Sequence, residues 1–505
     1  MSSTSDSAPR WSRAATCRGE PVSIFKACDV RGVFGEEWDL ADARRIGRSL
    51  GRMLRRRDQA AICVGGDFRR STPAIKTALV AGLLEAGIQV DDLGQLPTPA
   101  VYFTARQTHC ANLAVVTASH NPGKYNGVKF VVAGRPPLPD MIDELRGGQD
   151  ANEGRERPGT VRARTAVAQY EQWVVSRSRA MALEGLRTGA GRTFGREDTS
   201  TDSRSVETRE EDAGAAPPRL PRVVVDAMGG AMTGIARRAL EAAGYEVSAV
   251  RDELDPDFTT RNPNPSVDAN LRSLREAVAD RRAGIGIALD GDGDRVMFVD
   301  HGGAIARPEQ IAAWLLRRCF GRCRVVYDLK CASLVPRTVT ALGGQAIMQP
   351  SGHGFIRAMM LQSRAELGVE VSGHHFFGAL DGGDDGLFTA LLVLDLLART
   401  GANLADVLAA IPWPAITPDL RIAYRGDVAA AIETIAATCG GEVSRMDGVR
   451  AEYEIGGWAL ARASITEPAM TFRFEGRDRA HVLAIVERFL GNVPALLELV
   501  MERMS

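Results

Sequence analysis

The sequence has few cysteines and histidines, almost no net charge and no long apolar run. Its 505 residues carry a formal net charge of −1, so the whole protein has no electrostatic basis for binding nucleic acid or an acidic membrane. An anionic substrate would need a local basic pocket instead. Since no run of about eighteen apolar residues occurs, no membrane-spanning helix is predicted.

The eight cysteines do not indicate a disulfide framework in a chain of this length, and a cytoplasmic location is expected. Cys319 and Cys323 are followed by no second pair with zinc-ligand spacing, so we interpret both as ordinary thiols. The polar, arginine-containing start lacks the apolar core of a secretory signal and predicts a disordered tail.

Short apolar runs alternate with helical stretches, which favours parallel βαβ units, and the length predicts about three to four domains. One stretch is rich in Gly, Ser, Thr and charge, with little apolar surface to bury, and predicts a disordered insertion or linker. The expected divisions are a tail (1–20), a first domain (21–186), the insertion (187–220), and domains at 221–301, 302–412 and 413–505.

Individual elements can also be predicted from apolar spacing. The expected strands include Ala60–Val64, Leu113–Thr117, Arg222–Asp226, Gly284–Leu289, Val296–Val299, Arg324–Asp328 and Ala469–Phe474. The expected helices include Ala74–Ala86, Ala166–Arg177, Ala231–Ala243, Pro308–Cys319, Phe355–Leu361 and Ala480–Phe489.

The strongest chemical signal is the segment DGDGDR, in which Asp290, Asp292 and Asp294 alternate with glycines between two apolar runs. In a tight loop, this spacing lets three carboxylates converge on one cation, and hard oxygen donors favour Mg²⁺. An EF-hand calcium loop is excluded, because its sixth position would be Arg295 and its twelfth His301. A solvated acidic turn would leave three carboxylates repelling one another.

A second signal is TASHNP, which places Ser119 directly after an apolar strand-like run and is followed by YNGVK. Ser at such a junction is commonly only a turn or helix-capping residue. Here His120 and Lys129 supply cationic or acid–base groups, and the Asp segment supplies a candidate metal site. A bare serine hydroxyl is a weak nucleophile, whereas a metal-bound phosphoserine is a phosphoryl donor.

Two further segments are less specific. The loop VEVSGHH holds Glu370, Ser372 and His374, whose alternating donors and acceptors suit sugar hydroxyls, although an ordinary polar loop is equally compatible. The following DGGDDG is interpreted as a structural turn or helix cap, because adjacent Asp residues point differently. Near the C-terminus, RASITEP offers groups that bind phosphate, but alone it predicts only a loop.

In this order, the four segments resemble the α-D-phosphohexomutase family, and VEVSGH is similar to the loop of its phosphomannomutase/phosphoglucomutase branch. Shorter matches are FKACDVRG, GGDFR, DLKC and SGH. The resemblance covers nearly the whole chain outside the tail and the insertion. It implies an α/β fold with three similar mixed α/β domains and a C-terminal α+β domain around a central active-site cleft.

The resemblance also implies a reaction. Phosphorylated Ser119 would exchange its phosphoryl group with hexose 1-phosphates and 6-phosphates of mannose or glucose, through a hexose 1,6-bisphosphate. Mg²⁺ would be held by the phosphoserine and the three aspartates. Arg31, Lys129 and His374 would have acid–base or electrostatic roles. The implied substrate-binding residues are Arg295, Lys330, His353, Glu370, Ser372, Arg462, Ser464 and Thr466.

The expected partners are therefore small sugar phosphates, with no nucleic acid or membrane, in a monomer or small homo-oligomer. The chain departs from the family pattern where Cys28 replaces a tyrosine, Gly66 an arginine and Ile465 an asparagine of the phosphate loop.

Three alternatives compete with the mutase. In phosphoglucosamine mutases the position of Val371 is usually glutamine. A serine phosphatase with paired zinc would need more clustered histidines than the seven scattered here. A non-catalytic sugar-phosphate-binding relative would have no need of a nucleophile.

Overall fold

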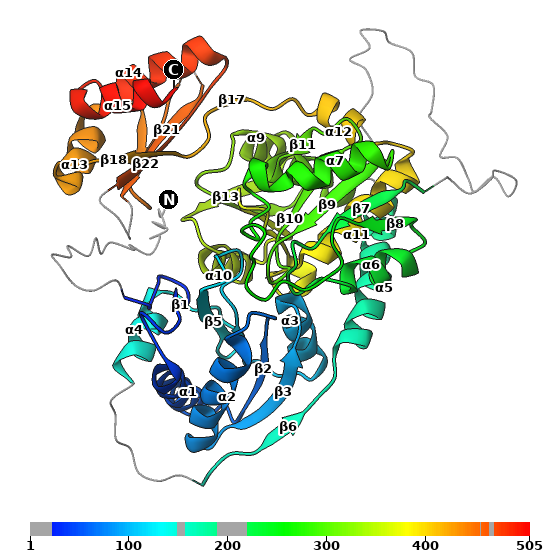
Figure 1. Ribbon diagram of the computed structural model, residues 1–505. Coiled ribbons are helices and arrows are strands. Elements are labelled where there is room, and N and C mark those ends of the chain that lie inside the picture. The colour runs from blue at the N-terminus through cyan, green and yellow to red at the C-terminus, as the bar shows by residue number, and fades with distance from the viewer. Residues whose placement is uncertain (1–22, 149–156, 189–219, 455, 464–468, 505) are drawn as a thin grey trace, which may run out of the picture.

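The computed structural model describes residues 23–148, 157–188, 220–454, 456–463 and 469–504, which form four sheets in chain order (Figure 1). The predicted α/β class is confirmed, since three sheets mix parallel and antiparallel strands and the C-terminal sheet is antiparallel. The predicted tail (1–20) and most of the predicted insertion (189–219) lie outside the described residues.

The first sheet has the strand order β1-β5-β4-β2-β3-β6, with a parallel centre and an antiparallel edge formed by β5 and β1. Side chains alternate across β2, so that Ile62 and Val64 enter one core cluster and Cys63 another. Its strands are β1 (Val30–Val33), β2 (Ala61–Gly66), β3 (Gln89–Gln95), β4 (Leu113–Val116), β5 (Tyr125–Val131) and β6 (Val161–Ala163).

Helices cover both faces of this sheet. Helices α1 (Leu40–Arg55) and α2 (Thr72–Glu85) pack together on one face, and α3 (Thr98–Gln107) covers the other. The crossing of α1 and α2 is close, because a Cβ on Gly82 would lie 2.1 Å from the Arg44 carbonyl oxygen. Helix α4 (Pro139–Gly147) packs against α1.

The second sheet has the order β11-β10-β9-β7-β8, in which β7 runs parallel to both its neighbours. The antiparallel pair β9 and β10 carries the predicted acidic loop at its turn. The elements are β7 (Val223–Asp226), α6 (Ile235–Ala242), β8 (Val247–Ala249), η1 (Asp268–Leu271), α7 (Arg272–Asp280), β9 (Ile285–Leu289), β10 (Val296–Asp300) and β11 (Ile305–Ala306).

Two predicted boundaries can be compared with these elements. Helix α6 starts four residues later than expected, because Gly234 precedes it with a φ of 73° that no helix interior adopts. The domain boundary at 301/302 stays a prediction, and β11 beyond it pairs with the second sheet.

The third sheet has the order β13-β12-β14-β15-β16, again with a parallel centre and an antiparallel edge. The expected helix Pro308–Cys319 is divided into α8 and the π-helical turn η2. The strands are β12 (Arg324–Asp328), β13 (Gln345–Gln349), β14 (Leu367–Val369), β15 (His375–Phe377) and β16 (Gly383–Asp384). The helices are α8 (Pro308–Leu315), η2 (Leu316–Phe320), α9 (Leu334–Ala341), α10 (His353–Ser363), η3 (Gly378–Leu380), α11 (Gly386–Thr400) and α12 (Leu404–Ala410).

The fourth sheet has the order β17-β22-β21-β20-β19, and β18 also pairs with β22. The strands are β17 (Ala415–Ile416), β18 (Leu420–Ala423), β19 (Glu442–Ser444), β20 (Val449–Glu452), β21 (Trp458–Ala463) and β22 (Ala469–Gly476). Helices α13 (Val428–Thr438), α14 (Arg479–Leu490) and α15 (Pro494–Met504) cover it at the C-terminal end (Figure 1).

A long helix, α5 (Val167–Arg187), connects the first sheet to the next two. It packs against α11, α6 and η2, and its buried residues belong to the same core cluster as those of α11 (Figure 1). This shared core fixes the first three sheets relative to one another. No single described helix is long and apolar enough to span a membrane; α11 and α12 reach that length and composition only as a pair, which is bent by 88°.

Candidate active site

Ser119 follows β4 in a strained conformation and touches the second sheet. Its φ of 50° lies in the left-handed region, which a non-glycine residue adopts only when its surroundings enforce it. Its buried Oγ donates to Asp290 Oδ2 at 2.7 Å and lies 3.3 Å from His120 Nδ1. The structure thus joins the predicted serine to the predicted acidic loop.

Two residues of the GGDFR segment hold the serine loop. The buried guanidinium of Arg69 donates to the carbonyl oxygens of Ser119 and Asn121, each at 2.7 Å, and also to those of two residues farther along the loop. Asp67 accepts from Arg69 Nε at 3.1 Å and from Thr117 Oγ1 at 2.8 Å. The sequence indicated this segment only as a match to the family. No feature of the neighbouring residues predicts that Arg69 binds a loop about fifty positions away.

The acidic loop between β9 and β10 approaches the serine loop closely and is buried. A Cβ on Gly291 would lie 2.4 Å from the Ser119 carbonyl oxygen, so the contact requires glycine. Asp290, Asp292 and Asp294 are almost fully buried, and one oxygen of each lies within 4.8 Å of the others. The predicted convergence of the three carboxylates is therefore observed.

The acidic loop has only part of its charge compensated by the protein. Lys129 Nζ contacts Asp292 Oδ2 at 2.8 Å and also Asp294 Oδ2, while Thr98 Oγ1 donates to Asp292 Oδ2 at 2.7 Å. The other oxygens, Oδ1 of Asp292 and Oδ1 of Asp294, are buried and have no hydrogen-bond partner in the part of the chain that the structure describes. Buried orphan oxygens in a cluster of three carboxylates are what a hard divalent cation requires, so these residues fit a metal site.

The pKa values of these groups are shifted by burial and by the charges that surround them. Burial and the neighbouring carboxylates raise the pKa of Asp290 well above its ordinary value. Burial opposes the charge on Asp292, but Lys129 and the Thr98 hydroxyl outweigh it and lower its pKa. Burial likewise opposes the charge on Lys129, but Asp292 and Asp294 raise its pKa well above its ordinary value. These contacts favour the charged ammonium form of Lys129.

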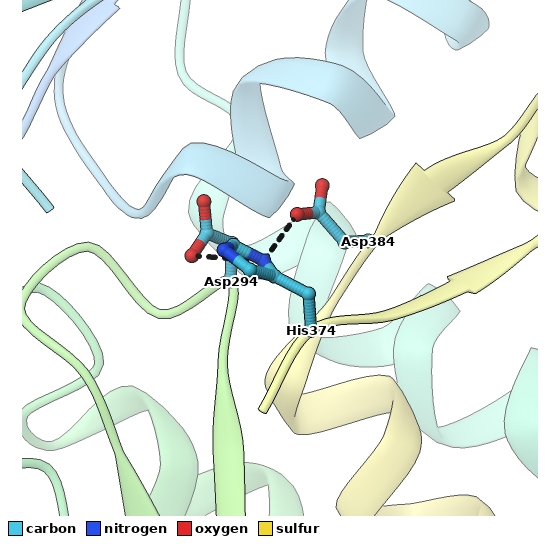
Figure 2. Close-up of side chains that lie close together, drawn as sticks. All are labelled: Asp294, His374 and Asp384. Atoms are coloured by element: carbon cyan, nitrogen blue, oxygen red, sulfur yellow. Dashed lines mark ion pairs between the residues drawn. The ribbon is translucent and has the colours of Figure 1, made fainter. Parts of the chain in front are cut away.

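His374 lies between the acidic loop and β16 (Figure 2). Its Nδ1 is 2.6 Å from Asp384 Oδ2 and 3.6 Å from Asp294 Oδ1. Its Nε2 accepts a hydrogen bond from Arg295 Nε at 2.9 Å. Burial, partly opposed by Asp294, lowers the pKa of His374 to about 4, and burial raises that of Asp384 to about 6.

The two adjacent aspartates of the segment DGGDDG have different contacts. The prediction of a helix cap is confirmed for Asp385, which caps α11 by accepting from the Phe388 amide at 2.9 Å. It is incomplete for Asp384, which lies on β16 and faces His374. Alternation along a strand sends neighbours to opposite sides, and this signal was present in the sequence.

The loop after β14 presents unpaired polar atoms. Glu370 Oε2 and Ser372 Oγ are buried and have no hydrogen-bond partner among the described residues. Lys330 Nζ contacts Asp419 Oδ2 at 3.2 Å, which connects the third sheet to the fourth. His353 begins α10, and burial, with Lys129 and His374 nearby, lowers its pKa well below the ordinary value.

Arg31 contacts the serine loop, whereas Arg462 connects the fourth sheet with the third. Arg31 NH1 donates to Asn121 Oδ1 of the serine loop at 3.1 Å, and its NH2 pairs with Asp29. Arg462, on β21, pairs with Asp447 at 2.6 Å and lies 3.4 Å from Ser351 Oγ on the third sheet. The predicted phosphate-binding residues Ser464 and Thr466, and the substituted position Ile465, lie outside the described residues.

Comparisons with known proteins agree along the chain. Family models of phosphoglucomutase/phosphomannomutase alpha/beta/alpha domains I, II and III match residues 22–154, 206–303 and 307–413. A phosphomannomutase/phosphoglucomutase of Pseudomonas aeruginosa is 31% identical over 94% of this chain and 96% of its own. A phosphoglucomutase of Neisseria gonorrhoeae is 30% identical over 92% and 95%.

A solved structure is similar over the same extent. A phosphoglucomutase/phosphomannomutase family protein of Burkholderia thailandensis is 30% identical and superimposes with a TM-score of 0.78, covering 94% of this chain and 98% of its own. A putative phosphomannomutase of Thermus thermophilus is 26% identical, with a TM-score of 0.72, and covers 95% and 99%.

Proposed function

The chain belongs to the phosphoglucomutase/phosphomannomutase family of enzymes, and from this we propose that it interconverts the 1- and 6-phosphates of mannose, glucose or both through a phosphorylated Ser119. The observation that carries the proposal is the 2.7 Å contact between Ser119 Oγ and Asp290 Oδ2, inside a buried cluster of three aspartates. A nucleophile held against a cation site is the arrangement that phosphoryl transfer needs.

The three aspartates, with an oxygen of phosphorylated Ser119, would hold Mg²⁺. When bound, the ion would offset the negative charge of the transferring phosphoryl group. Lys129 contributes a positive charge beside Asp292 and Asp294. Arg31 is held at the serine loop through Asn121 and adds a second positive charge there.

The two half-reactions are symmetrical. In the first, the bond between Ser119 Oγ and phosphorus breaks, and a bond forms between phosphorus and the free hydroxyl of the bound hexose phosphate. The hydroxyl loses a proton and Ser119 Oγ gains one, so no net proton is consumed. The product is a hexose 1,6-bisphosphate, which turns around and returns its other phosphate to Ser119. His120 Nδ1 lies 3.3 Å from Oγ, and we assign to it the exchange of a proton with the serine oxygen.

Substrate recognition would come from the third and fourth sheets and, through Arg295, from the acidic loop of the second sheet. Glu370 Oε2 and Ser372 Oγ are buried and unpaired among the described residues, which suits them to sugar hydroxyls. The remaining proposed contacts to the sugar and its two phosphates come from Arg295, Lys330, His353, Arg462, Ser464 and Thr466. Since each end of the bisphosphate must occupy both phosphate positions, these contacts must tolerate either orientation of the ring.

A direct assay tests the proposal. The purified protein is incubated with mannose 1-phosphate or glucose 1-phosphate, Mg²⁺ and a trace of the corresponding hexose 1,6-bisphosphate. We expect the 6-phosphate to form, and Ser119→Ala to abolish its formation. Ser176→Ala is the matched control, because Ser176 is exposed on α5 and its Oγ donates only to Trp173 O. Turnover that survives Ser119→Ala would refute the phosphoserine mechanism.

The same assay addresses the alternatives. Glucosamine phosphate as the preferred substrate would assign the chain to the phosphoglucosamine branch in spite of Val371. Binding of hexose phosphates without turnover, by protein shown to carry phosphoserine and Mg²⁺, would establish a non-catalytic relative.

A further inference from the structure

The first residue of α3 contacts the acidic loop of the second sheet. The backbone amide of Thr98 donates to Asp292 O at 3.0 Å, and the Thr98 hydroxyl donates to Asp292 Oδ2 at 2.7 Å. Thr98 is fully buried. The two residues are 194 positions apart in the sequence, so these bonds hold the start of α3 against a loop from another sheet.

The first turn of α3 has a backbone donor available for this contact. The first amides of any helix have no partner inside it and must find one elsewhere. Here Pro97 O accepts from the amides of Ala100 and Val101 at 3.0 and 3.4 Å, and Pro99 has no N–H group. The amide of Thr98 is the remaining donor of the turn, and it bonds to the acidic loop.

Two side chains hold the same oxygen of Asp292. Its Oδ2 accepts from the Thr98 hydroxyl and from Lys129 Nζ, whereas its Oδ1 is buried and has no hydrogen-bond partner among the described residues. Two donors that come from different elements limit the rotation of the carboxylate about its Cβ–Cγ bond. The other oxygen is then already ordered when a cation arrives, so less conformational entropy is lost on binding.

Thr98 and Lys129 should affect a cation in opposite ways. The ammonium group of Lys129 lies beside Asp292 and Asp294 and repels a second positive charge that enters the cluster. The hydroxyl of Thr98 is neutral, so it orients the carboxylate without opposing the ion. Removing the lysine should therefore favour cation binding, and removing the hydroxyl should weaken it.

A structural bond between the two sheets is the competing explanation. The backbone amide of Thr98 already joins α3 to the acidic loop, and any residue except proline would supply it. The hydroxyl adds a contact to a side-chain oxygen of Asp292, one of the three carboxylates that converge. Substitutions that change only the side chain can therefore separate the role of the hydroxyl from that of the backbone.

We propose that Thr98 is a positioning residue of the cation site, whose hydroxyl holds Asp292 Oδ2 so that Oδ1 faces the ion. This rests on the proposed function, which supplies the ion. It adds a residue of α3 to a site otherwise formed by the serine loop and the acidic loop. The segment LPTPA contains no local signal of this role, because its partner lies 194 positions later.

Mg²⁺ affinity, measured by isothermal titration calorimetry on the purified full-length protein, tests the proposal without turnover. Thr98→Val keeps the shape and the backbone amide but lacks the hydroxyl, whereas Thr98→Ser keeps the hydroxyl. We expect Thr98→Val to raise the Kd for Mg²⁺ by about 10-fold to 100-fold, the usual cost of removing a group that orients a ligand. Thr98→Ser should stay close to wild type. Equal Kd values for Thr98→Val and wild type, or a Thr98→Ser variant as weak as Thr98→Val, would overturn the proposal.

Thr104→Val is the matched control. Thr104 is also buried on α3, but its hydroxyl donates to Ala100 O inside the same helix, at 2.8 Å. Its substitution should leave the Kd for Mg²⁺ unchanged. A loss as large as that of Thr98→Val would mean that the packing of α3 determines the affinity, and would reject the orienting role. Thermal melting without Mg²⁺ shows that each variant is folded, and intact mass shows that all preparations carry the same phosphorylation.

Failure of this proposal differs from failure of the proposed function. A protein that converts hexose phosphates but binds Mg²⁺ equally well with and without the Thr98 hydroxyl would keep the mutase function and reject the role of Thr98. A protein that converts neither sugar phosphate but loses Mg²⁺ affinity in Thr98→Val, and regains it in Thr98→Ser, would reject the function and support the role. Absence of any Mg²⁺ binding by wild type would overturn the role of Thr98, and the mutase assay would then decide the function separately.

Discussion

Substitution of Arg69 by Met should release the loop that holds Ser119. The Arg69 side chain is fully buried and donates to four loop carbonyl oxygens as well as to Asp67. Breaking a buried ion pair by removing one partner costs about 3–5 kcal/mol, and a buried acceptor left unpaired, here Ser119 O, about 1–3 kcal/mol more. Water can reach the other three carbonyl groups, which are only partly buried.

A total of about 4 kcal/mol, at the low end of that sum, corresponds to roughly a 1,000-fold change in the opening equilibrium of the loop. Hydrogen–deuterium exchange of peptides covering residues 117–129 measures this locally, without assuming that a protein with four sheets unfolds in one step. We expect hydrogen exchange in these peptides to accelerate by about 100-fold to 1,000-fold. Mutase turnover should fall as well.

Arg70→Met is the matched control for Arg69→Met. Arg70 is the next residue and pairs with Asp257, but its side chain is 76% exposed. An exposed ion pair contributes about 0–1 kcal/mol, so exchange of the serine loop should change less than about fivefold. If Arg69→Met left the exchange of the serine loop as close to wild type as Arg70→Met does, the clamp would not be what maintains the positive φ of Ser119.

Other predictions concern the acidic loop and the helix crossing. Lys129→Met should make Mg²⁺ raise the melting temperature more than it does in wild type, since Asp292 and Asp294 lose their cation; an unchanged Mg²⁺ effect would argue against the shared site. Chelation should abolish turnover and added Mg²⁺ restore it, as measured in the mutase assay; activity in excess chelator would exclude a required metal. Gly82→Ala should destabilise the first sheet by more than about 2 kcal/mol in guanidinium unfolding, because its Cβ would overlap the Arg44 carbonyl oxygen, whereas Gly147→Ala meets open space and should change stability by less than about 1 kcal/mol.

The sequence was most informative where function depends on one short segment. The spacing of Asp290, Asp292 and Asp294 sufficed to predict that three carboxylates converge, since alternate residues of a tight loop share a side. Ser119 was placed correctly at a strand end for the same local reason. Its contact with Asp290, across 171 positions of sequence, followed only from the family resemblance, because spacing says nothing of how two sheets are arranged.

Residues that act on another segment were the ones missed. Arg69 looked like any charged residue after a strand, yet it is buried and its partners lie about fifty positions later. Asp384 and Asp385 were expected to point differently, but only a structural turn or helix cap was predicted for the segment, whereas Asp384 faces His374. In both cases the function of the side chain is set by tertiary packing, which a local pattern does not contain.

The geometry around Ser119 also indicates why its phosphorylation and a bound cation should depend on each other. In the unmodified chain Ser119 Oγ donates its hydrogen to Asp290 Oδ2. A phosphoserine has no hydrogen on Oγ and brings about −1.5 to −2 charges, so it loses this bond and faces the carboxylate instead. Lys129 is already committed to Asp292 and Asp294, which leaves Asp290 to repel the new charge. A cation shared between Asp290 and the phosphate would remove that repulsion, so the proposed phosphorylation of Ser119 and the proposed cation would favour each other.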